Sequence, residues 1–396
     1  MKITIVDSPC GSGKTTMAIN YMDEKYEDRF IYITPYKNEL TRVINSSNRR
    51  FIQPDVKRGK GSKTRHFLDL IREGEDVCST HALFRNLDED TKDIIKEKEY
   101  ILILDEVMDV VEQVKISKRD IEILINDKIV KVDNEHKMYW IDEDYKGEFL
   151  KFKRMIKNGD TYLFNDTMIL WSFPCEIFKA FKEVYILTYL FDGQIQRYYY
   201  DINNLEYEYK SVRRNQLSNE YELIDYIKPD LSQYKELIHI YEGNLNRIGR
   251  ERGALSVTWM NRSKDTQALR MLKNNTVNYF INITKSKSVD NMWTTFNDFE
   301  TSLKGKGYSK GFVECNARAT NEFKNKKNLA YLCNRYYNPI IKNFFMNKGV
   351  NINEDDWALS ELIQWLFRSQ IRENKEINIY IPSIRMRELL IQWMDS

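Results

Sequence analysis

The sequence has few cysteines, no long apolar run and almost no excess of charge of either sign. Its five cysteines are scattered through the chain and form no C-x-x-C pair. This argues against a zinc site and a disulfide framework, and it fits a reducing cytosol. No apolar run approaches the roughly 18 residues that a membrane span needs, and the start does not look like a signal peptide. We therefore expect a cytoplasmic protein without a membrane partner.

The charge balance does not point to a partner by itself. Lys and Arg number 61 and Asp and Glu number 59, which leaves a net charge of +2. Any basic surface for nucleic acid must therefore be local. The 396 residues, of which 42% are hydrophobic, are enough for about two domains with cores of their own.

Residues 1–16, MKITIVDSPCGSGKTT, join a β-branched strand to a glycine-rich turn that ends in Lys-Thr-Thr. Glycines let backbone amides turn toward an anion, and the helix that follows directs the positive end of its dipole to the same place. This order is typical of a nucleotide-phosphate cradle. The expected cradle residues are Gly11, Ser12, Gly13, Lys14, Thr15 and Thr16.

Within this cradle, Lys14 is expected to reach the β and γ phosphates of ATP, and the Thr15 hydroxyl to bind Mg²⁺. The turn departs from G-x-x-x-x-G-K-[ST] at its first position, which is Ser8. Serine is tolerable there if the turn does not need a positive φ. The alternative interpretation is an ordinary glycine-rich turn between a strand and a helix.

The first half of the chain alternates strands with helices, which predicts a doubly wound parallel sheet. Strands are expected at 2–6, 30–34, 75–79, 100–104 and 183–188, with helices over about 14–26, 35–44, 80–85 and 88–97 and after Pro174. Residues of about 113–170 interrupt this rhythm, and we expect an insertion there. The second half also indicates α/β structure, with strands expected at 254–259 and 278–283 among others, so we expect domains at 1–195 and 196–396.

The apolar strand at 100–104 ends in two carboxylates, Asp105 and Glu106. Ligands of α/β proteins bind at the carboxyl ends of the strands. Together with the glycine-rich turn, this pair predicts a Walker B element. Asp105 would hold Mg²⁺, and Glu106 would orient or polarise the attacking water. A solvated strand end is the alternative.

With these two motifs in place, the chain resembles the DEAD/DEAH-like helicases and translocases of superfamily 2. Residues 105–108, Asp-Glu-Val-Met, look like the D-E-x-x box of that family. Four further segments fall in the expected order: 33–40 is similar to motif Ia, 79–83 to a "G-T-H-A-L" motif, 187–189 to motif III and 315–321 to motif V. Gln364, Arg368 and Arg372 resemble motif VI, which carries an arginine finger.

The resemblance implies tandem RecA-like domains and an ATP-dependent helicase or translocase, compact and of phage or bacterial type. Its partner would be nucleic acid, most simply DNA in replication or recombination, with replication proteins as candidate partners in the bacterial host cytoplasm. Lys14, Glu106 and either Arg368 or Arg372 would act in catalysis. The nucleic-acid backbone would lie on Thr34, Lys37, Thr80 and His81, with Arg318 and Thr320 as further candidates.

Plain structural roles stand beside these assignments. Thr80 precedes a predicted helix, where threonine is also a good N-cap, and His81 could be a packed or surface residue. Arg368 and Arg372 are four apart on a helix expected over 358–372, so they would share one face, as solvated arginine pairs often do. The tyrosines and basic residues of 198–214 could clamp a single strand or form an exposed β-surface.

Two other functions also use a P-loop. A phage terminase-type packaging ATPase would need a nuclease with several metal-binding carboxylates in the second half, and we see no such acidic set. A P-loop nucleotide kinase or regulatory NTPase would hydrolyse ATP without any motor activity. A helicase relative that has lost hydrolysis is disfavoured by the intact Lys14, Thr15, Asp105 and Glu106.

Overall fold

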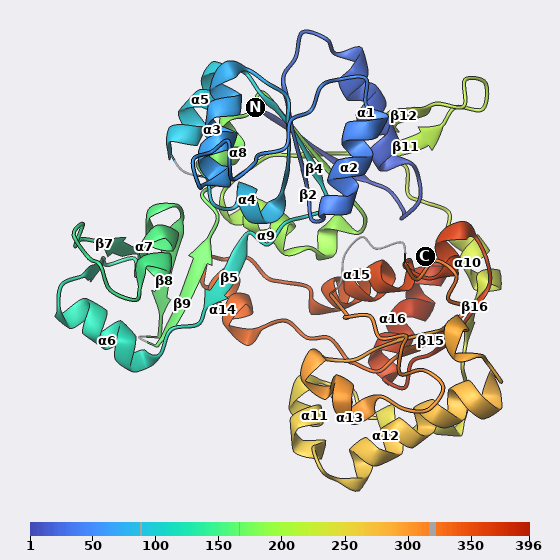
Figure 1. Ribbon diagram of the computed structural model, residues 1–396. Coiled ribbons are helices and arrows are strands. Elements are labelled where there is room, and N and C mark those ends of the chain that lie inside the picture. The colour runs from blue at the N-terminus through green and yellow to red at the C-terminus, as the bar shows by residue number, and fades with distance from the viewer. Residues whose placement is uncertain (88, 166, 317–321) are drawn as a thin grey trace. The chain divides into compact units, whose positions relative to one another are not determined.

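We describe the protein from a computed structural model that covers residues 1–87, 89–165, 167–316 and 322–396 (Figure 1). Its contacts divide the chain into two compact units. Unit 1 comprises Met1–Ser8, Ser12–Ile227 and Asn338–Ile352, and unit 2 comprises Pro9–Gly11, Lys228–Tyr337 and Asn353–Ser396. Each unit has a parallel β-sheet of its own. In the part of the chain that is described, no helix has both the length and the apolar character needed to cross a bilayer.

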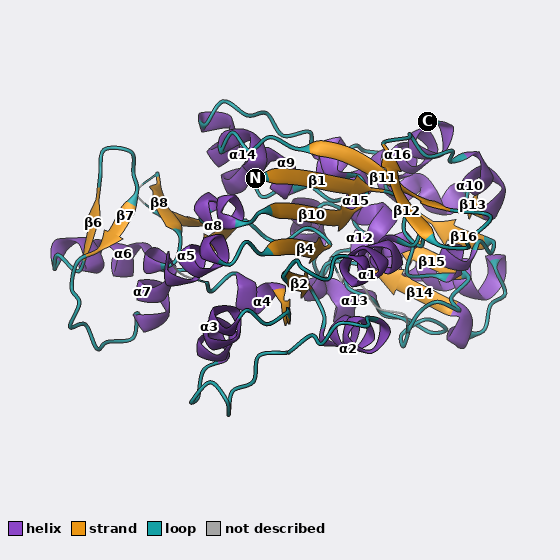
Figure 2. Ribbon diagram, turned by 90° about the horizontal axis from the view of Figure 1, so that it is seen from above, coloured by secondary structure: helices purple, strands orange, loops and turns teal. Residues whose placement is uncertain are grey.

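Unit 1 is built on a seven-stranded sheet that is parallel except at one edge, where the last strand runs antiparallel (Figure 2). Its central strands are almost wholly apolar, as expected for strands covered on both faces. In sheet order, the strands are β12 (Tyr221–Asp225), β11 (Glu208–Arg214), β1 (Lys2–Asp7), β10 (Glu183–Thr188), β4 (Ile101–Asp105), β2 (Phe30–Thr34) and β3 (Val77–Thr80).

The register of this sheet brings the predicted motifs to one edge. Asp7 at the end of β1 lies opposite Thr188 at the end of β10, and Leu187 lies opposite Asp105 at the end of β4. The glycine-rich turn, the motif III segment and the Walker B carboxylates therefore follow three adjacent strands at their carboxyl ends. This is the edge at which open α/β sheets bind ligands.

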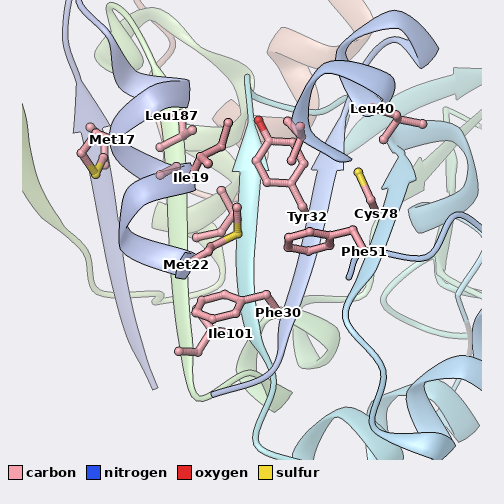
Figure 3. Packing of buried hydrophobic residues seen from close by; sticks show 14 residues of the cluster. Met17, Ile19, Met22, Phe30, Tyr32, Leu40, Phe51, Cys78, Ile101 and Leu187 are labelled. Atoms are coloured by element: carbon pink, nitrogen blue, oxygen red, sulfur yellow. The ribbon is translucent and has the colours of Figure 1, made fainter. Parts of the chain in front are cut away.

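Helices cover both faces of the sheet, and α1 carries the P-loop lysine at its first residue. Met17 and Met22 of α1 pack into a buried cluster with Phe30, Tyr32 and Leu187 of the strands (Figure 3). Burying each such side chain contributes about 1.5–3 kcal/mol. The helices of this sheet are α1 (Lys14–Glu24), α2 (Lys37–Ser46), α3 (Lys63–Glu73), α4 (His81–Phe84), α5 (Glu89–Glu97), α8 (Cys175–Ala180) and α9 (Ile195–Ile202).

Between β4 and β10 the chain forms the insertion, which has a small core of its own around Leu124, Phe152 and Ile169. A three-stranded antiparallel sheet, ordered β5-β9-β8, is accompanied by a β6–β7 hairpin and two helices. The elements are β5 (Val111–Val114), α6 (Lys118–Asn126), β6 (Val130–Val132), β7 (Met138–Trp140), α7 (Leu150–Lys157), β8 (Asp160–Phe164) and β9 (Met168–Ser172).

One helix from far along the chain, α14 (Pro339–Asn347), returns to unit 1 and packs beside β5 (Figure 1). The Phe344 ring lies 5.7 Å from that of Tyr162, measured between centroids. The Asn338 side-chain amide caps α14 and donates to Gln113 Oε1 at 3.1 Å. The insertion is therefore held both by its own connections and by this helix.

Unit 2 has a four-stranded parallel sheet in the order β13-β16-β15-β14. Its core includes the large rings of Trp293, Tyr308 and Tyr380. The strands are β13 (Ile238–Ile240), β14 (Asn291–Thr294), β15 (Asn328–Tyr331) and β16 (Ile377–Tyr380), and the helices are α10 (Ser232–Leu237), α11 (Val257–Ser263), α12 (Gln267–Asn278), α13 (Glu300–Leu303), α15 (Glu354–Leu366) and α16 (Ile384–Asp395).

The tyrosine-rich segment differs from its predicted strand conformation. Residues 198–200 lie in α9, and all three tyrosines are buried. The Tyr199 hydroxyl donates to the Phe173 carbonyl at 2.8 Å, and Tyr200 accepts from the Gln196 side chain at 2.8 Å. Tertiary packing thus outweighs the β propensity of tyrosine. The first sheet then continues through β11 and β12 to Asp225, beyond the division expected near residue 195.

Candidate functional site

The glycine-rich turn has the backbone geometry that a phosphate cradle requires. Gly11 has φ +87° and Gly13 has φ +90°, in the left-handed region that favours glycine. A Cβ on Gly13 would also lie 2.2 Å from the Tyr221 ring of β12. Both its backbone conformation and the nearby Tyr221 ring therefore favour glycine at position 13. Helix α1 begins at the next residue.

Ser8, the residue that departs from the consensus, does not have a positive φ, so the condition for serine at this position is met. Its hydroxyl accepts from the Val212 amide of β11 at 3.0 Å. Its carbonyl accepts from the Lys14 ammonium at 2.5 Å, and Lys14 is only 9% exposed. The Lys14 side chain therefore points back to the first residue of the turn in which it is predicted to bind phosphate.

Asp7, which no sequence motif predicts as a site residue, joins the end of β1 to the segment that follows β10. Its carboxylate accepts from the amides of Leu190 and Phe191 at 2.9 and 3.0 Å. Burial raises the pKa of Asp7 to about 6, although these hydrogen bonds and the charge of Lys14 oppose the rise. Its position directly before Ser8 at the end of β1 was the available signal.

Asp105 is held by a tyrosine from the neighbouring strand. The Tyr32 hydroxyl, buried in the core of the sheet, donates to Asp105 Oδ2 at 2.8 Å. Burial and then the nearby charge of Glu106 raise the pKa of Asp105 to about 7, and the Tyr32 hydrogen bond lowers it. A carboxyl group in this state is easily converted to a carboxylate when a cation binds beside it.

Glu106 has φ +66°, an uncommon conformation for a residue other than glycine. Its amide donates to the Leu187 carbonyl of β10 at 2.9 Å, which holds the turn in place. Its Oε2 is buried and, among the described residues, has no hydrogen-bond partner. Backbone strain and an orphaned carboxylate oxygen are both typical of functional positions.

Three hydroxyl oxygens at the same edge are also buried without a hydrogen-bond partner within the described parts of the chain. They belong to Ser12 of the glycine-rich turn, Thr34 at the end of β2 and Thr188 at the end of β10. Buried polar groups in native proteins are normally satisfied. These oxygens and Glu106 Oε2 therefore fit the presence of a polar ligand such as a triphosphate with Mg²⁺.

The residues predicted to touch nucleic acid lie at two neighbouring strand ends. Thr34 and Thr80 are register partners at the ends of β2 and β3, with Lys37 at the start of α2 and His81 at the start of α4. Lys37 is exposed, and Thr80 and His81 are partly exposed. Thr80 makes no side-chain capping bond to α4. Thr34 was predicted to contact nucleic acid at the surface, but it is 0% exposed and therefore buried.

The motif VI segment of unit 2 differs from the predicted helix. Helix α15 ends at Leu366, and Arg372 lies in a separate 3₁₀ turn, Gln370–Glu373, whose first amides are capped by Ser369. The two arginines therefore do not share one helical face. Arg368 is 5% exposed, whereas Arg372 is an exposed residue. Arg318 and Thr320 lie outside the described residues.

Among solved structures, a chain described as "XPD_APO" aligns over 98% of this chain and 95% of its own length, with 9% identity and a TM-score of 0.51. Another, described as "XPD_Helicase", covers 98% of this chain and 94% of its own, with 9% identity and a TM-score of 0.46. The first likeness concerns the fold alone. It confirms the predicted fold class, α/β with tandem RecA-like parallel sheets.

Sequence comparison gives a closer relation. A "YonV C-terminal Rossmann-like domain" matches residues 232–394, and a "YonV middle domain" matches residues 111–171, which is the insertion. The "SPbeta prophage-derived uncharacterized protein YonV" of Bacillus subtilis (strain 168) is 45% identical over 414 residues, which cover 100% of this chain and 99% of the relative. The chain therefore belongs to the YonV family.

Proposed function

We propose that this protein is a nucleic-acid-dependent ATPase that couples ATP hydrolysis to movement along, or unwinding of, DNA. The observation that carries the proposal is the meeting of a P-loop with Asp105 and Glu106 at one edge of a helicase-like sheet. Adjacent strands bring them there, and several polar atoms at this edge lack partners within the described residues. Such an edge suits a bound triphosphate better than a purely structural role.

In the proposed site, the amides of the glycine-rich turn and the Lys14 ammonium bind the phosphates. Mg²⁺, held by the Thr15 hydroxyl and Asp105, would neutralise charge that develops on the phosphate oxygens. Glu106 orients the attacking water, and its Oε2, which has no partner among the described residues, can accept a hydrogen bond from that water. The positive φ of Glu106, in a turn held by the hydrogen bond from its amide to the Leu187 carbonyl, sets the direction in which its side chain leaves the backbone.

An arginine of unit 2 completes the proposed machinery. Arg368 or Arg372 would stabilise negative charge on the transferring phosphoryl group, as arginine fingers do. A cycle of ATP binding and hydrolysis would then move a bound nucleic-acid strand. The prophage origin of the YonV relative supports a role in phage or bacterial DNA replication or recombination.

The test is strand separation on a forked DNA duplex with one labelled strand, in the presence of ATP and Mg²⁺. We expect ATP-dependent release of the labelled strand, and none from the Lys14→Ala variant. ATP turnover that no DNA or RNA changes, together with an intact fork, would contradict the proposal and favour a regulatory NTPase.

A further inference from the structure

A groove lies between α3 and α7 in unit 1, away from the glycine-rich turn. It has a volume of about 640 Å³ and is lined by Ser62, Thr64, Arg85, Lys151, Arg154 and Trp171, among others. We call it the α3–α7 groove. One wall comes from Ser62 and Thr64 at the start of α3 and from Ala82 of α4, and the other comes from α7 of the insertion. Its two walls belong to the same compact unit.

Two cations of α7, Lys151 and Arg154, line the α3–α7 groove, and Ser62 and Thr64 line it at the start of α3. The segment 57–65, which contains Ser62 and Thr64, carries five cations and no acidic residue. Within the described ranges, none of these seven cations forms an ion pair with a carboxylate. The five of the segment 57–65 are Lys57, Arg58, Lys60, Lys63 and Arg65.

The floor of the groove is already neutral and rigid. The Arg85 guanidinium pairs with Glu112 at 2.8 Å and stacks over the Trp171 ring, 4.7 Å from its centroid. The Trp171 indole N–H donates to the Met155 carbonyl of α7 at 3.1 Å. Because the Glu112 carboxylate is paired with Arg85, its charge does not offset those of Lys151 and Arg154.

The groove also adjoins a segment already predicted to touch nucleic acid. Ala82 of α4 lines it, and α4 begins at His81, directly after Thr80. A nucleic-acid strand bound at the carboxyl end of β3 would therefore continue directly into the groove. This neighbourhood could not be predicted from the sequence, because the segment 57–65 and α7 are far apart in the chain.

We propose that the α3–α7 groove binds the phosphate backbone of single-stranded nucleic acid. Lys151 and Arg154 of its lining, unpaired among the described residues, and the cations of the adjoining segment 57–65 match a polyanion. Backbone contacts of this kind need no particular base sequence. The inference rests on the proposed function, whose substrate it specifies.

Binding of a fluorescein-labelled oligothymidylate, followed by anisotropy over a series of salt concentrations, tests this. The double variant Lys151→Ala/Arg154→Ala should bind about tenfold more weakly at low salt. Its plot of log affinity against log salt should also be shallower by about 1.4, because each lost phosphate contact on a single strand removes about 0.7. Arg58→Ala/Lys60→Ala, which removes two exposed cations from the segment that contains the lining residues Ser62 and Thr64, should act in the same direction.

The matched control is Lys118→Ala/Arg119→Ala, which removes two exposed cations from α6 of the same insertion. It should bind as the parent does, and circular dichroism melting shows whether each variant is folded. If both groove variants, once folded, bind like the control, or if the parent binds no oligothymidylate, the groove proposal is wrong. ATP hydrolysis without nucleic acid, measured in the same samples, reports separately on the P-loop site.

Discussion

Tyr32 and Asp105 are joined across neighbouring strands of the central sheet, with the tyrosine hydroxyl donating to Asp105 Oδ2 at 2.8 Å. Tyr32 is itself fully buried, so the bond forms where the core of unit 1 meets the carboxyl edge of the sheet. The proposed metal ligand is therefore positioned by the hydrophobic core and not by the loop that follows it.

This environment makes the stability of the metal-free protein depend on pH. The pKa of Asp105 is raised from 3.8 to about 7 in the folded protein, chiefly by burial. A raised pKa of a carboxyl group favours the folded state below pH 3.8, and this contribution is lost as the pH rises through about 7. Asp105→Asn removes the titration while keeping a partner for Tyr32.

In EDTA, the unfolding free energy of Asp105→Asn relative to the parent should therefore rise between pH 5 and pH 7. The expected slope approaches about 1.4 kcal/mol per pH unit. Urea unfolding at a series of pH values measures it. A difference between the two proteins that stays constant over this range would show that Asp105 is not desolvated.

Replacing Lys14 with alanine should reduce ATP hydrolysis by about two to three orders of magnitude, the usual cost of losing one donor to a developing charge. The fold should persist, because Lys14 hydrogen-bonds to the Ser8 carbonyl within the turn, whereas the core packing of α1 rests on Met17 and Met22. Steady-state phosphate release measures the loss. Full turnover by a folded Lys14→Ala protein would overturn the P-loop assignment.

Glu106→Gln should bind ATP and stall before hydrolysis, because it keeps the shape of the side chain but removes its basicity. A general base contributes about 10²–10⁴-fold. Glu99→Gln is a matched control, since Glu99 also has a positive φ, of 54°. Glu99 lies just before β4, whereas Glu106 lies just after it. Fluorescent-nucleotide binding and phosphate release should separate the two variants. A normal rate in Glu106→Gln would remove Glu106 from its proposed role.

The two arginines of the motif VI segment are expected to differ. Arg372 is exposed, so Arg372→Ala should leave the melting temperature unchanged, whereas Arg368 is 5% exposed and its replacement should lower it. One of the two variants should lose about 10³–10⁵-fold in ATP turnover, as removal of an arginine finger does. Near-normal turnover in both folded proteins would exclude a finger in this segment.

Much of unit 1 could be predicted because its signals are local. The strand before the glycine-rich turn, the apolar run before Asp105 and the helix at Lys14 all lie within a few residues of their predicted positions. Parallel strands then bring their ends together without further information. Asp7 and Tyr32 were missed because their roles depend on partners in other strands.

Unit 2 was harder to predict, since short capping signals decide its elements. A strand was expected at 254–259, but the Ser256 hydroxyl accepts from the Trp259 amide and begins α11. Residues 278–283, also expected as a strand, continue α12 as a π-helical turn with Tyr279 and Phe280 buried. β-branched and aromatic residues favour strands in isolation, and burial in a helical layer reversed that preference here.

The most direct test of the account is the ATPase rate of the full chain with Mg²⁺, measured without nucleic acid and with single-stranded, duplex and forked DNA and RNA. We predict measurable hydrolysis that nucleic acid stimulates, with stimulation lost in Lys14→Ala. A folded protein that hydrolyses no ATP, or one whose rate is the same with every nucleic acid, would contradict the central claim.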